Sequence, residues 1–358
     1  MEDGKSFVDA FDIDLTSNIL TFLSDPSDLI RAGAVSHSWR HFVIANGLCK
    51  NLWMQKVPQV AYVACADEES DGILKVSNVT SKNAASWGTL EKEHKLFSSL
   101  LQPFSKPIIS PKCMLAFPVG ASSTDRDPPV TIINTLTPED CSFWSSKGHS
   151  DPNAPEYLLY RLNASISILT EVDIRAVESH WEPGYPIYSP KSVRFRMGHP
   201  KSVENVEMGI CPVDQPSLDK YVWTYTSSEF PMAQISRLQK FKLPEPVCVG
   251  GVIMIELLGR TQKDATDDLF YIRLRHVRFM GQALEPAFYA EMYPSGELQL
   301  NYYPQALDSV LQSFSVEKAA VVLSELPELE IATRQERCEE LCVEMAEGVL
   351  FLSDDEDN

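Results

Sequence analysis

The feature that most restricts the fold of this chain is an amphipathic stretch at residues 11–42. Its apolar residues recur at spacings of three and four, the pattern of helices with one buried face. They are Leu15, Ile19, Leu20, Phe22, Leu23, Leu29, Ile30, Val35 and Trp39. Pro26 interrupts the pattern and Ser36 is placed to cap a further helix, so the stretch predicts three short helices. Such a short segment rarely folds alone, so other residues or a partner must cover part of its surface.

The same stretch contains three segments in a fixed order. They are Ile19-Leu20-Thr21-Phe22-Leu23, Asp28-Leu29 and Val35-Ser36-His37-Ser38-Trp39-Arg40. In order and spacing they resemble an F-box, the helical module that docks a receptor protein onto the adaptor subunit of an SCF-type cullin ubiquitin ligase. The family usually opens with Leu-Pro where Phe11 and Asp12 stand here; proline in the first helical turn is favourable without being obligatory. The alternative is a generic helical hairpin.

The resemblance implies a hydrophobic interface in which a few helical side chains enter a groove on the adaptor. The residues expected to contact the adaptor are Leu15, Ile19, Leu20, Leu23, Leu29, Val35 and Trp39. The adaptor would belong to the S-phase kinase-associated protein family and would connect the chain to a cullin. The alternative for individual residues, Val35 and Trp39 above all, is that they pack inside the module.

Composition argues against several classes of function. The 358 residues carry 31 Lys and Arg against 50 Asp and Glu, a formal net charge of −19. This balance disfavours binding to nucleic acid or to anionic membrane surfaces, since both need a basic face. No run of about eighteen apolar residues is present, so no membrane span is expected.

The cysteines and the first residues bear on the compartment. Eight cysteines are scattered without CxxC pairs. This pattern indicates free thiols in a reducing compartment, and neither a zinc site nor another cofactor is expected. The first residues are acidic and lack the basic start of a secretory signal. We therefore expect the protein in the nucleus or the cytoplasm.

Changes in residue pattern divide the chain into five parts. They are an F-box module at 8–57, a linker with a helix and a Pro-rich segment at 58–138, a β-sandwich at 139–283, a helical extension at 284–347 and an acidic disordered tail at 348–358. Within the linker, residues 90–101 have helical spacing, and prolines then recur up to residue 138. At the start of the extension, residues 285–303 are ambiguous and fit a hairpin around residues 294–296.

Short runs rich in β-branched and aromatic residues fill residues 139–283. Residues 192–198 alternate most clearly, with Val193, Phe195 and Met197 on one face and arginines on the other. Gly, Pro, Asn and Asp lie between the runs, as in antiparallel sandwiches. The expected fold class is therefore a multi-domain α + β chain, with helices first, then an antiparallel β-sandwich, then C-terminal helices.

Five short motifs follow one another in this part of the chain. They are Phe143-Trp144-Ser145-Ser146, Ile168-Leu169-Thr170-Glu171-Val172-Asp173-Ile174, Ser192-Val193-Arg194-Phe195, Phe241-Lys242-Leu243-Pro244 and Tyr271-Ile272-Arg273-Leu274-Arg275-His276-Val277. In this order they resemble the galactose-binding-like jelly roll, the fold shared by discoidin-type, carbohydrate-binding and DOC domains. An F-box combined with this sandwich also resembles an uncharacterised group of plant F-box proteins, which supports the pairing without naming a substrate.

A turn-rich loop between two expected strands, residues 179–188, collects three aromatic residues, a histidine and a glutamate. The candidate ligand residues are His180, Trp181, Tyr185 and Tyr188. Exposed rings in such loops can stack on sugar rings or grip a peptide. The alternative, which is the commoner arrangement, is that these rings cover the core of the sandwich.

The sequence contains no nucleophile elbow, phosphate-binding loop or HExxH motif. We therefore expect a non-catalytic protein, the substrate-recognition subunit of an SCF-type cullin E3 ubiquitin ligase. Its F-box would bind the adaptor, and its sandwich would hold an unknown protein or glycoprotein target. The alternative is a lectin-like or peptide-binding scaffold protein without a role in ubiquitin transfer.

Overall fold

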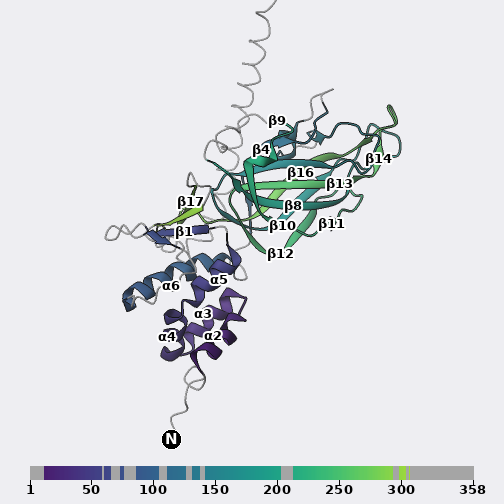
Figure 1. Ribbon diagram of the computed structural model, residues 1–358. Helices are drawn as coiled ribbons and strands as arrows, with labels where there is room; N and C mark the ends of the chain where they lie inside the picture. The colour runs from purple at the N-terminus through teal and green to yellow at the C-terminus, as the bar shows by residue number, and fades with distance from the viewer. Residues whose placement is uncertain are drawn as a thin grey trace, which may run out of the picture.

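A helical module, a small sheet and a large β-sandwich follow one another through the molecule (Figure 1). The computed structural model describes residues 12–58, 60–65, 73–75, 86–104, 111–125, 131–137, 142–202, 213–292, 298–303 and 306. The predicted order, with helices first and an antiparallel sandwich after them, is confirmed. Among the described residues, no helix has both the length and the apolar character needed to cross a membrane.

Four short helices form the described part of the module. They are α2 (Ile13–Thr21), α3 (Pro26–Ala34), α4 (His37–Ala45) and α5 (Leu48–Lys56). The Asp25 side chain accepts a hydrogen bond from Ser27 N at 2.8 Å, and Ser36 Oγ accepts one from Trp39 N at 3.3 Å. These contacts satisfy N–H groups that helix starts leave free. Gly47 has φ 58°, a left-handed conformation that turns the chain between α4 and α5.

A small sheet and one longer helix lie next to the module. The sheet has the order β17-β18-β1-β2, and its strands are β1 (Val60–Cys65), β2 (Ile73–Lys75), β17 (Phe288–Met292) and β18 (Leu298–Tyr302). Strands β1 and β18 are parallel, so chain segments from the two ends of the described region meet here. Helix α6 (Trp87–Leu101) packs against α4 and α5.

Two sheets face each other and form the sandwich. One has the order β10-β8-β13-β6-β4-β9 with β11 also paired to β8, and the other has the order β12-β7-β16-β3 with β5 paired to β16. The first contains β4 (Ala116–Ala121), β6 (Glu156–Leu162), β8 (Pro190–Pro200), β9 (Val213–Asp214), β10 (Tyr221–Thr226), β11 (Phe230–Pro231) and β13 (Val252–Arg260). The second contains β3 (Lys112–Met114), β5 (Trp144–Ser145), β7 (Ser167–Ala176), β12 (Gln239–Val249) and β16 (Arg273–Ala283). Apart from β4 with β9, the described pairs of the sandwich are antiparallel.

Short elements complete the fold. Strands β14 (Gln262–Lys263) and β15 (Phe270–Tyr271) pair with each other, and β14 is labelled at the tip of the sandwich farthest from the helices (Figure 1). Three 3-10 turns are η1 (Gln102–Phe104), η2 (Ile132–Thr135) and η3 (Leu218–Lys220). The loops that end near β14 therefore lie on the side of the sandwich away from the module.

Alternate side chains of the strands fill the space between the two sheets. Val193, Phe195 and Met197 of β8 are fully buried there, while Arg194 and Arg196 remain partly exposed. This alternation is the one predicted for residues 192–198. The sequence pattern therefore assigned the inner and outer faces of this strand correctly.

The module and the sandwich share one hydrophobic core. Its buried members come from the helices, from α6, from the small sheet and from the near end of the sandwich, where Ile166, Ile168 and Cys248 belong to it. Trp53 of α5 and Phe97 of α6 are fully buried within it. The module is thus packed against the sandwich rather than joined to it by a free linker.

The structure differs from the predicted division at both ends of the sandwich. Residues 58–138, predicted as a linker, supply β1, β2, β3 and β4. The predicted extension at 284–347 begins with β17 and β18, which pair as the hairpin expected for residues 285–303. Strand β1 pairs with β18 and β3 pairs with β16, and pairing between distant segments leaves little local pattern to read.

The predicted helix at residues 90–101 is present as α6, which begins three residues earlier. Ser86 Oγ accepts a hydrogen bond from Thr89 N at 3.4 Å and caps this start. The helices predicted beyond residue 306 and the acidic tail at 348–358 lie outside the described residues. What the sequence predicts for these two segments therefore stays a prediction.

Candidate functional site

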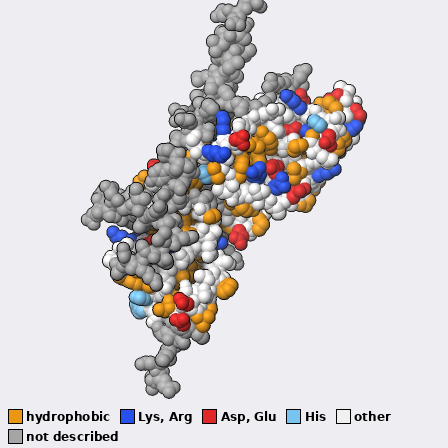
Figure 2. Space-filling model, viewed as in Figure 1, with side chains coloured by type: hydrophobic (Ala, Val, Ile, Leu, Met, Phe, Trp, Pro, Cys, Tyr) orange, Lys and Arg blue, Asp and Glu red, His pale blue; other side chains and the backbone are white. Residues whose placement is uncertain are grey.

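The helical module exposes an apolar stripe along α2. Leu15, Ile19 and Phe22 lie four and three residues apart, on one side of the helix, and are 47%, 38% and 85% exposed. Ile30 of α3 and Val35 just after it are also exposed. Figure 2 shows hydrophobic side chains at several places on the surface of the module. Large apolar side chains left in water on so small a module indicate a surface that a partner covers.

Two residues predicted to contact an adaptor lie in the core instead. Leu20 is 5% exposed and Leu29 is 2% exposed, and both belong to the core shared with the sandwich. Leu20 follows Ile19 by one position, so it points about 100° away around the helix and packs inward. The prediction of direct adaptor contacts is therefore wrong for Leu20 and Leu29, which support the exposed stripe from below.

Leu23 and Trp39 take an intermediate position, because both are partly buried and pack against the shared core. The alternative considered for Trp39, packing inside the module, therefore holds in part. Val35 stays exposed, at 64%. For Leu15, Ile19 and Val35 the structure provides the exposure that an adaptor contact needs, and the contact itself stays a prediction.

The loop between β7 and β8, at the end of the sandwich away from the module, forms a second surface. Trp181 and Tyr185 are 59% and 58% exposed, and His180 is exposed beside them. Trp181 stacks on Phe143 with ring centres 5.8 Å apart, and His180 meets Tyr185 edge to face at 5.7 Å. Tyr188 is fully buried. Three of the four predicted ligand residues thus face solvent, and Tyr188 covers the core as the alternative supposed.

A buried network of charges holds this loop in place. Glu182 accepts hydrogen bonds from Ser179 Oγ at 2.6 Å and from the Tyr188 hydroxyl at 2.5 Å. Arg273 Nη1 donates to Glu182 at 2.9 Å, and its Nη2 donates to Asp264 at 2.7 Å. One guanidinium therefore joins the β7–β8 loop to the turn after β14.

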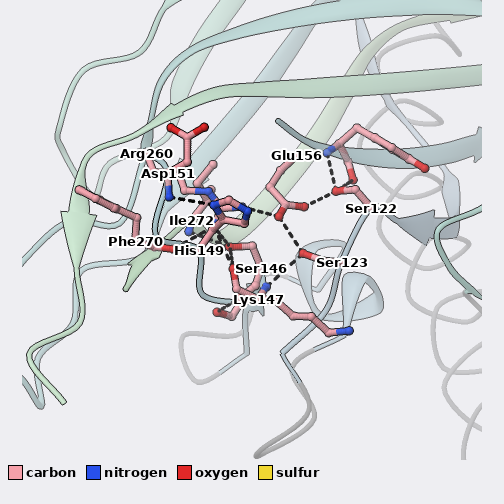
Figure 3. Close-up of polar contacts among 12 residues, drawn as sticks. Ser122, Ser123, Ser146, Lys147, His149, Asp151, Glu156, Arg260, Phe270 and Ile272 are labelled. Carbon is pink, nitrogen blue, oxygen red and sulfur yellow. Dashed lines mark hydrogen bonds and ion pairs between the residues drawn. The ribbon is translucent and has the colours of Figure 1, made fainter. Parts of the chain in front are cut away.

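A second buried ion pair closes the same end of the sandwich (Figure 3). Arg260 Nη2 lies 2.5 Å from Glu156 Oε1, and the two side chains are 1% and 6% exposed. Arg260 also donates to Ser146 Oγ and to two backbone carbonyls. The hydroxyls of Ser122 and Ser123 donate to the Glu156 carboxylate. Both carboxylate oxygens are thus occupied by the chain itself, which makes this pair a structural link between strands.

The described part of the chain contains no group of three or more His, Cys, Asp or Glu side chains placed to hold a metal ion. Burial raises the pKa of the Cys49 and Cys248 thiols to about 12, so both stay protonated. These thiols act as small apolar groups of the core.

Sequence reasoning missed part of the exposed apolar surface, namely Ile13, Phe22 and Ile30. Their helical spacing is visible, but spacing alone does not say which side of an amphipathic helix faces its own core. It also missed the ion pair of Arg260 and Glu156, because charged residues are rarely fully buried and nothing local marks the exception.

Comparison with known proteins decides the family. No family model matches the chain. The F-box protein At4g00755 of Arabidopsis thaliana is 40% identical over 305 residues, which cover 80% of this chain and 78% of that relative. The chain belongs to the F-box protein family. The resemblance seen in residues 19–40 is thereby confirmed, and the helical module is hereafter called the F-box.

Solved structures similar to this F-box protein cover about half of the chain. A CBM32 domain from a family 31 glycoside hydrolase of Clostridium perfringens has a TM-score of 0.32 and 12% identity, and covers 47% of this chain and 91% of that chain. An F5/8 type C domain from Bacteroides fragilis has a TM-score of 0.34 and 12% identity, and covers 49% and 99%. These are the kinds of domain that the sequence motifs resemble.

Proposed function

We propose that this F-box protein is the substrate-recognition subunit of an SCF-type cullin E3 ubiquitin ligase. Its F-box would bind an adaptor of the S-phase kinase-associated protein family and, through it, a cullin. The main support is the stripe of Leu15, Ile19 and Phe22, which is exposed to solvent, whereas Leu20 and Leu29 pack in the chain's own core. Its sandwich would bind a protein or glycoprotein target, in the nucleus or the cytoplasm.

In this role the protein contributes position rather than a reactive group. The F-box packs against the near end of the sandwich, and the exposed β7–β8 loop lies at the far end. A target held by the sandwich would stay close to the conjugating enzyme carried by the complex, which raises the effective concentration of the two. No catalytic step by this chain is part of the proposal.

The test is direct binding of the purified full chain to a purified adaptor of that family, measured by calorimetry. Replacing two stripe residues together, Ile19→Asp and Phe22→Asp, is expected to weaken binding about 100-fold or more, because interface energy concentrates in a few apolar anchors. Trp181→Asp is the control, since it places the same acid on a 59% exposed apolar residue at the far end. Undiminished binding of the double variant would reject the assigned interface.

The second candidate is a lectin-like or peptide-binding scaffold with no part in ubiquitin transfer. The exposed rings of Trp181 and Tyr185 favour it, since they would serve such a protein equally well. The same experiment separates the two. A folded, monodisperse chain that binds no adaptor at any concentration tested would favour the scaffold.

A further inference from the structure

The exposed rings of the β7–β8 loop are presented on a firmly held turn. Gly184 and Tyr185 have φ of 83° and 50°, so two successive residues adopt the left-handed conformation, which a tyrosine rarely does. Backbone hydrogen bonds close the turn, from Glu182 N to Ser179 O and from Tyr185 N to Glu182 O, both at 3.1 Å. Strained backbone of this kind persists only where its surroundings enforce it, and it concentrates at binding sites.

The network beneath the turn supplies that enforcement. The Glu182 side chain points inward and is held by Ser179, Tyr188 and Arg273. Tyr188 stacks under the Arg273 guanidinium, whose carbon lies 4.0 Å from the ring centre. A polar residue of the turn is thus fixed inside, while its aromatic residues are kept in water. An aromatic surface that is already held rigidly loses little conformational freedom when it binds a ligand. Its entropy penalty on binding is therefore smaller.

One carboxylate lies beside these rings, and a second lies on the neighbouring turn. The Glu178 carboxylate lies 4.0 Å from His180 Nε2 and accepts a hydrogen bond from the neutral Ser236 hydroxyl at 2.8 Å. Across the Arg273 link, the Asp267 carboxylate accepts from the Tyr271 hydroxyl at 2.6 Å. In both cases the donor is a neutral hydroxyl, so the hydrogen bond does not compensate the negative charge of the carboxylate.

Two positive groups between the two turns, Arg273 and Lys263, are already shared or paired, and Arg175 Nε donates to the Ser236 carbonyl at 2.8 Å. Arg273 carries one charge and contacts two carboxylates, those of Glu182 and Asp264. Lys263 Nζ lies 2.8 Å from Asp268 Oδ2, so it is paired with its own neighbour. Neither Arg273 nor Lys263 therefore compensates the carboxylates of Glu178 and Asp267, in a chain whose net charge is −19.

We propose that this end of the sandwich, formed by the rings of His180, Trp181 and Tyr185 with Glu178 and Asp267, docks a Lys or Arg side chain of a target protein. The inference rests on the receptor role proposed above and names its substrate class. Cations bind over aromatic faces, Trp best of all, and a nearby carboxylate adds attraction. The same end of the fold already uses this chemistry internally, with Arg273 over Tyr188 and Lys263 over Phe270 at 5.1 Å.

The test uses the full chain and labelled Gly-Ser peptides that differ only at two central positions, read by fluorescence polarisation. Peptides with two Arg or two Lys are expected to bind, and those with two citrullines or two Glu are not. Binding is expected to weaken as salt is raised, since exposed charges are screened. Galactose and N-acetylglucosamine are offered as competitors and are expected to leave the polarisation unchanged.

Three variants locate the binding. Trp181→Ala and Glu178→Gln are each expected to weaken peptide binding, the first about tenfold. Glu178→Gln keeps an oxygen that can accept from Ser236, so it removes the charge alone. Tyr289→Ala is the control, because Tyr289 is a 39% exposed ring on the small sheet and is expected to leave binding unchanged.

Several results would overturn the inference: equal binding of citrulline and Arg peptides, full binding by Trp181→Ala, or Trp181-dependent binding of the sugars. The double variant, Ile19→Asp with Phe22→Asp, distinguishes a failure of this inference from a failure of the proposed function. It is expected to lose the adaptor and keep the peptide. Adaptor binding without any peptide binding would reject the proposed substrate class and leave the receptor role in place.

Discussion

The guanidinium carbon of Arg273 lies 4.0 Å from the ring centre of Tyr188, at the end of the sandwich away from the F-box. The same guanidinium contacts the carboxylates of Glu182 and Asp264, and its side chain is only 9% exposed. The β7–β8 loop therefore depends on one cation for both its charge balance and its packing. Loss of that cation would leave two half-buried carboxylates without their partner.

Replacing Arg273 tests how far this loop depends on it. Arg273→Ala is expected to lower the free energy of unfolding by about 3–5 kcal/mol, the usual effect of breaking a buried ion pair from one side. Urea unfolding followed by circular dichroism measures it. Arg273→Lys keeps the charge but not the two-pronged geometry, so it should recover only part of the loss. A loss below about 1 kcal/mol in Arg273→Ala would show that the network is dispensable.

Buried histidines make the stability of the protein dependent on pH. Burial lowers the pKa of His94, His199 and His276. In His199 and His276 a hydrogen bond to a backbone carbonyl raises the pKa, but the effect of burial is larger. Each binds a proton more readily unfolded than folded, so their contribution to stability is complete above the unfolded pKa of about 6.5 and is lost as pH falls below it. The free energy of unfolding is expected to fall between pH 7 and pH 5, by up to about 1.4 kcal/mol per pH unit and proton.

His199 is the best residue for checking the pH dependence, because it is 4% exposed. His199→Gln removes one titrating group and keeps a side chain that can donate a hydrogen bond to the Pro200 carbonyl. Urea unfolding at a series of pH values should therefore show a flatter dependence in the variant. An unchanged slope would mean that His199 does not contribute to the pH dependence of stability.

Neighbouring residues of α2 should separate stability from adaptor binding. Leu20→Ala is expected to lower the free energy of unfolding by about 2–4 kcal/mol, because it leaves a cavity in the shared core. Ile19→Ala should change it by less than about 1 kcal/mol, since Ile19 is 38% exposed. Adaptor affinity at low temperature, where both variants are folded, should show the reverse order. If Leu20→Ala had the larger effect on both stability and adaptor affinity, the assignment of Leu20 to the inner face of α2 and Ile19 to its outer face would be contradicted.

The helices of the F-box show how much the sequence could predict. The first three follow from spacing, from Pro26 and from the cap at Ser36, all of which are local signals. The inward side of α2 was not predictable, because both Ile19 and Leu20 fit an apolar helix face. The choice between them depends on α5 and the shared core, which come from elsewhere in the chain.

The same limit applies to the rest of the chain. Alternation fixed the inner face of β8 from residues 192–198 alone. The parallel pairing of β1 with β18 joins segments far apart in sequence, and no property of either segment names the other. In the β7–β8 loop the aromatic cluster was visible, but the burial of Tyr188 involves Arg273, which lies on another strand.

The shared core predicts that the F-box and the sandwich unfold together. Phe97 is fully buried in that core. Phe97→Ala should lower the free energy of unfolding by about 3–5 kcal/mol. The helical signal at 222 nm and the tryptophan fluorescence should still fall at the same urea concentration, as in a single cooperative transition. Two separate steps in these signals would show that the F-box unfolds on its own.

The pair of Glu156 and Arg260 lends itself to a double-mutant cycle. Arg260→Met leaves a carboxylate that is 6% exposed without its cation, and Glu156→Gln leaves the buried guanidinium without its anion. Each single change should therefore lower the free energy of unfolding by about 3–5 kcal/mol. The double variant should lose clearly less than the sum, because neither charge is then left unpaired.

The matched control for this cycle is an ion pair in water, Asp28 with Arg31, whose side chains are 52% and 76% exposed. Its two partners are three residues apart on α3, so a cycle with Asp28→Asn and Arg31→Met should give a coupling close to zero. A large coupling for Glu156 with Arg260 and none for Asp28 with Arg31 would assign the effect to burial. Equal couplings would mean that the buried pair is as well solvated as the exposed one, and that the far end of the sandwich is held together by its serine hydroxyls and apolar core instead.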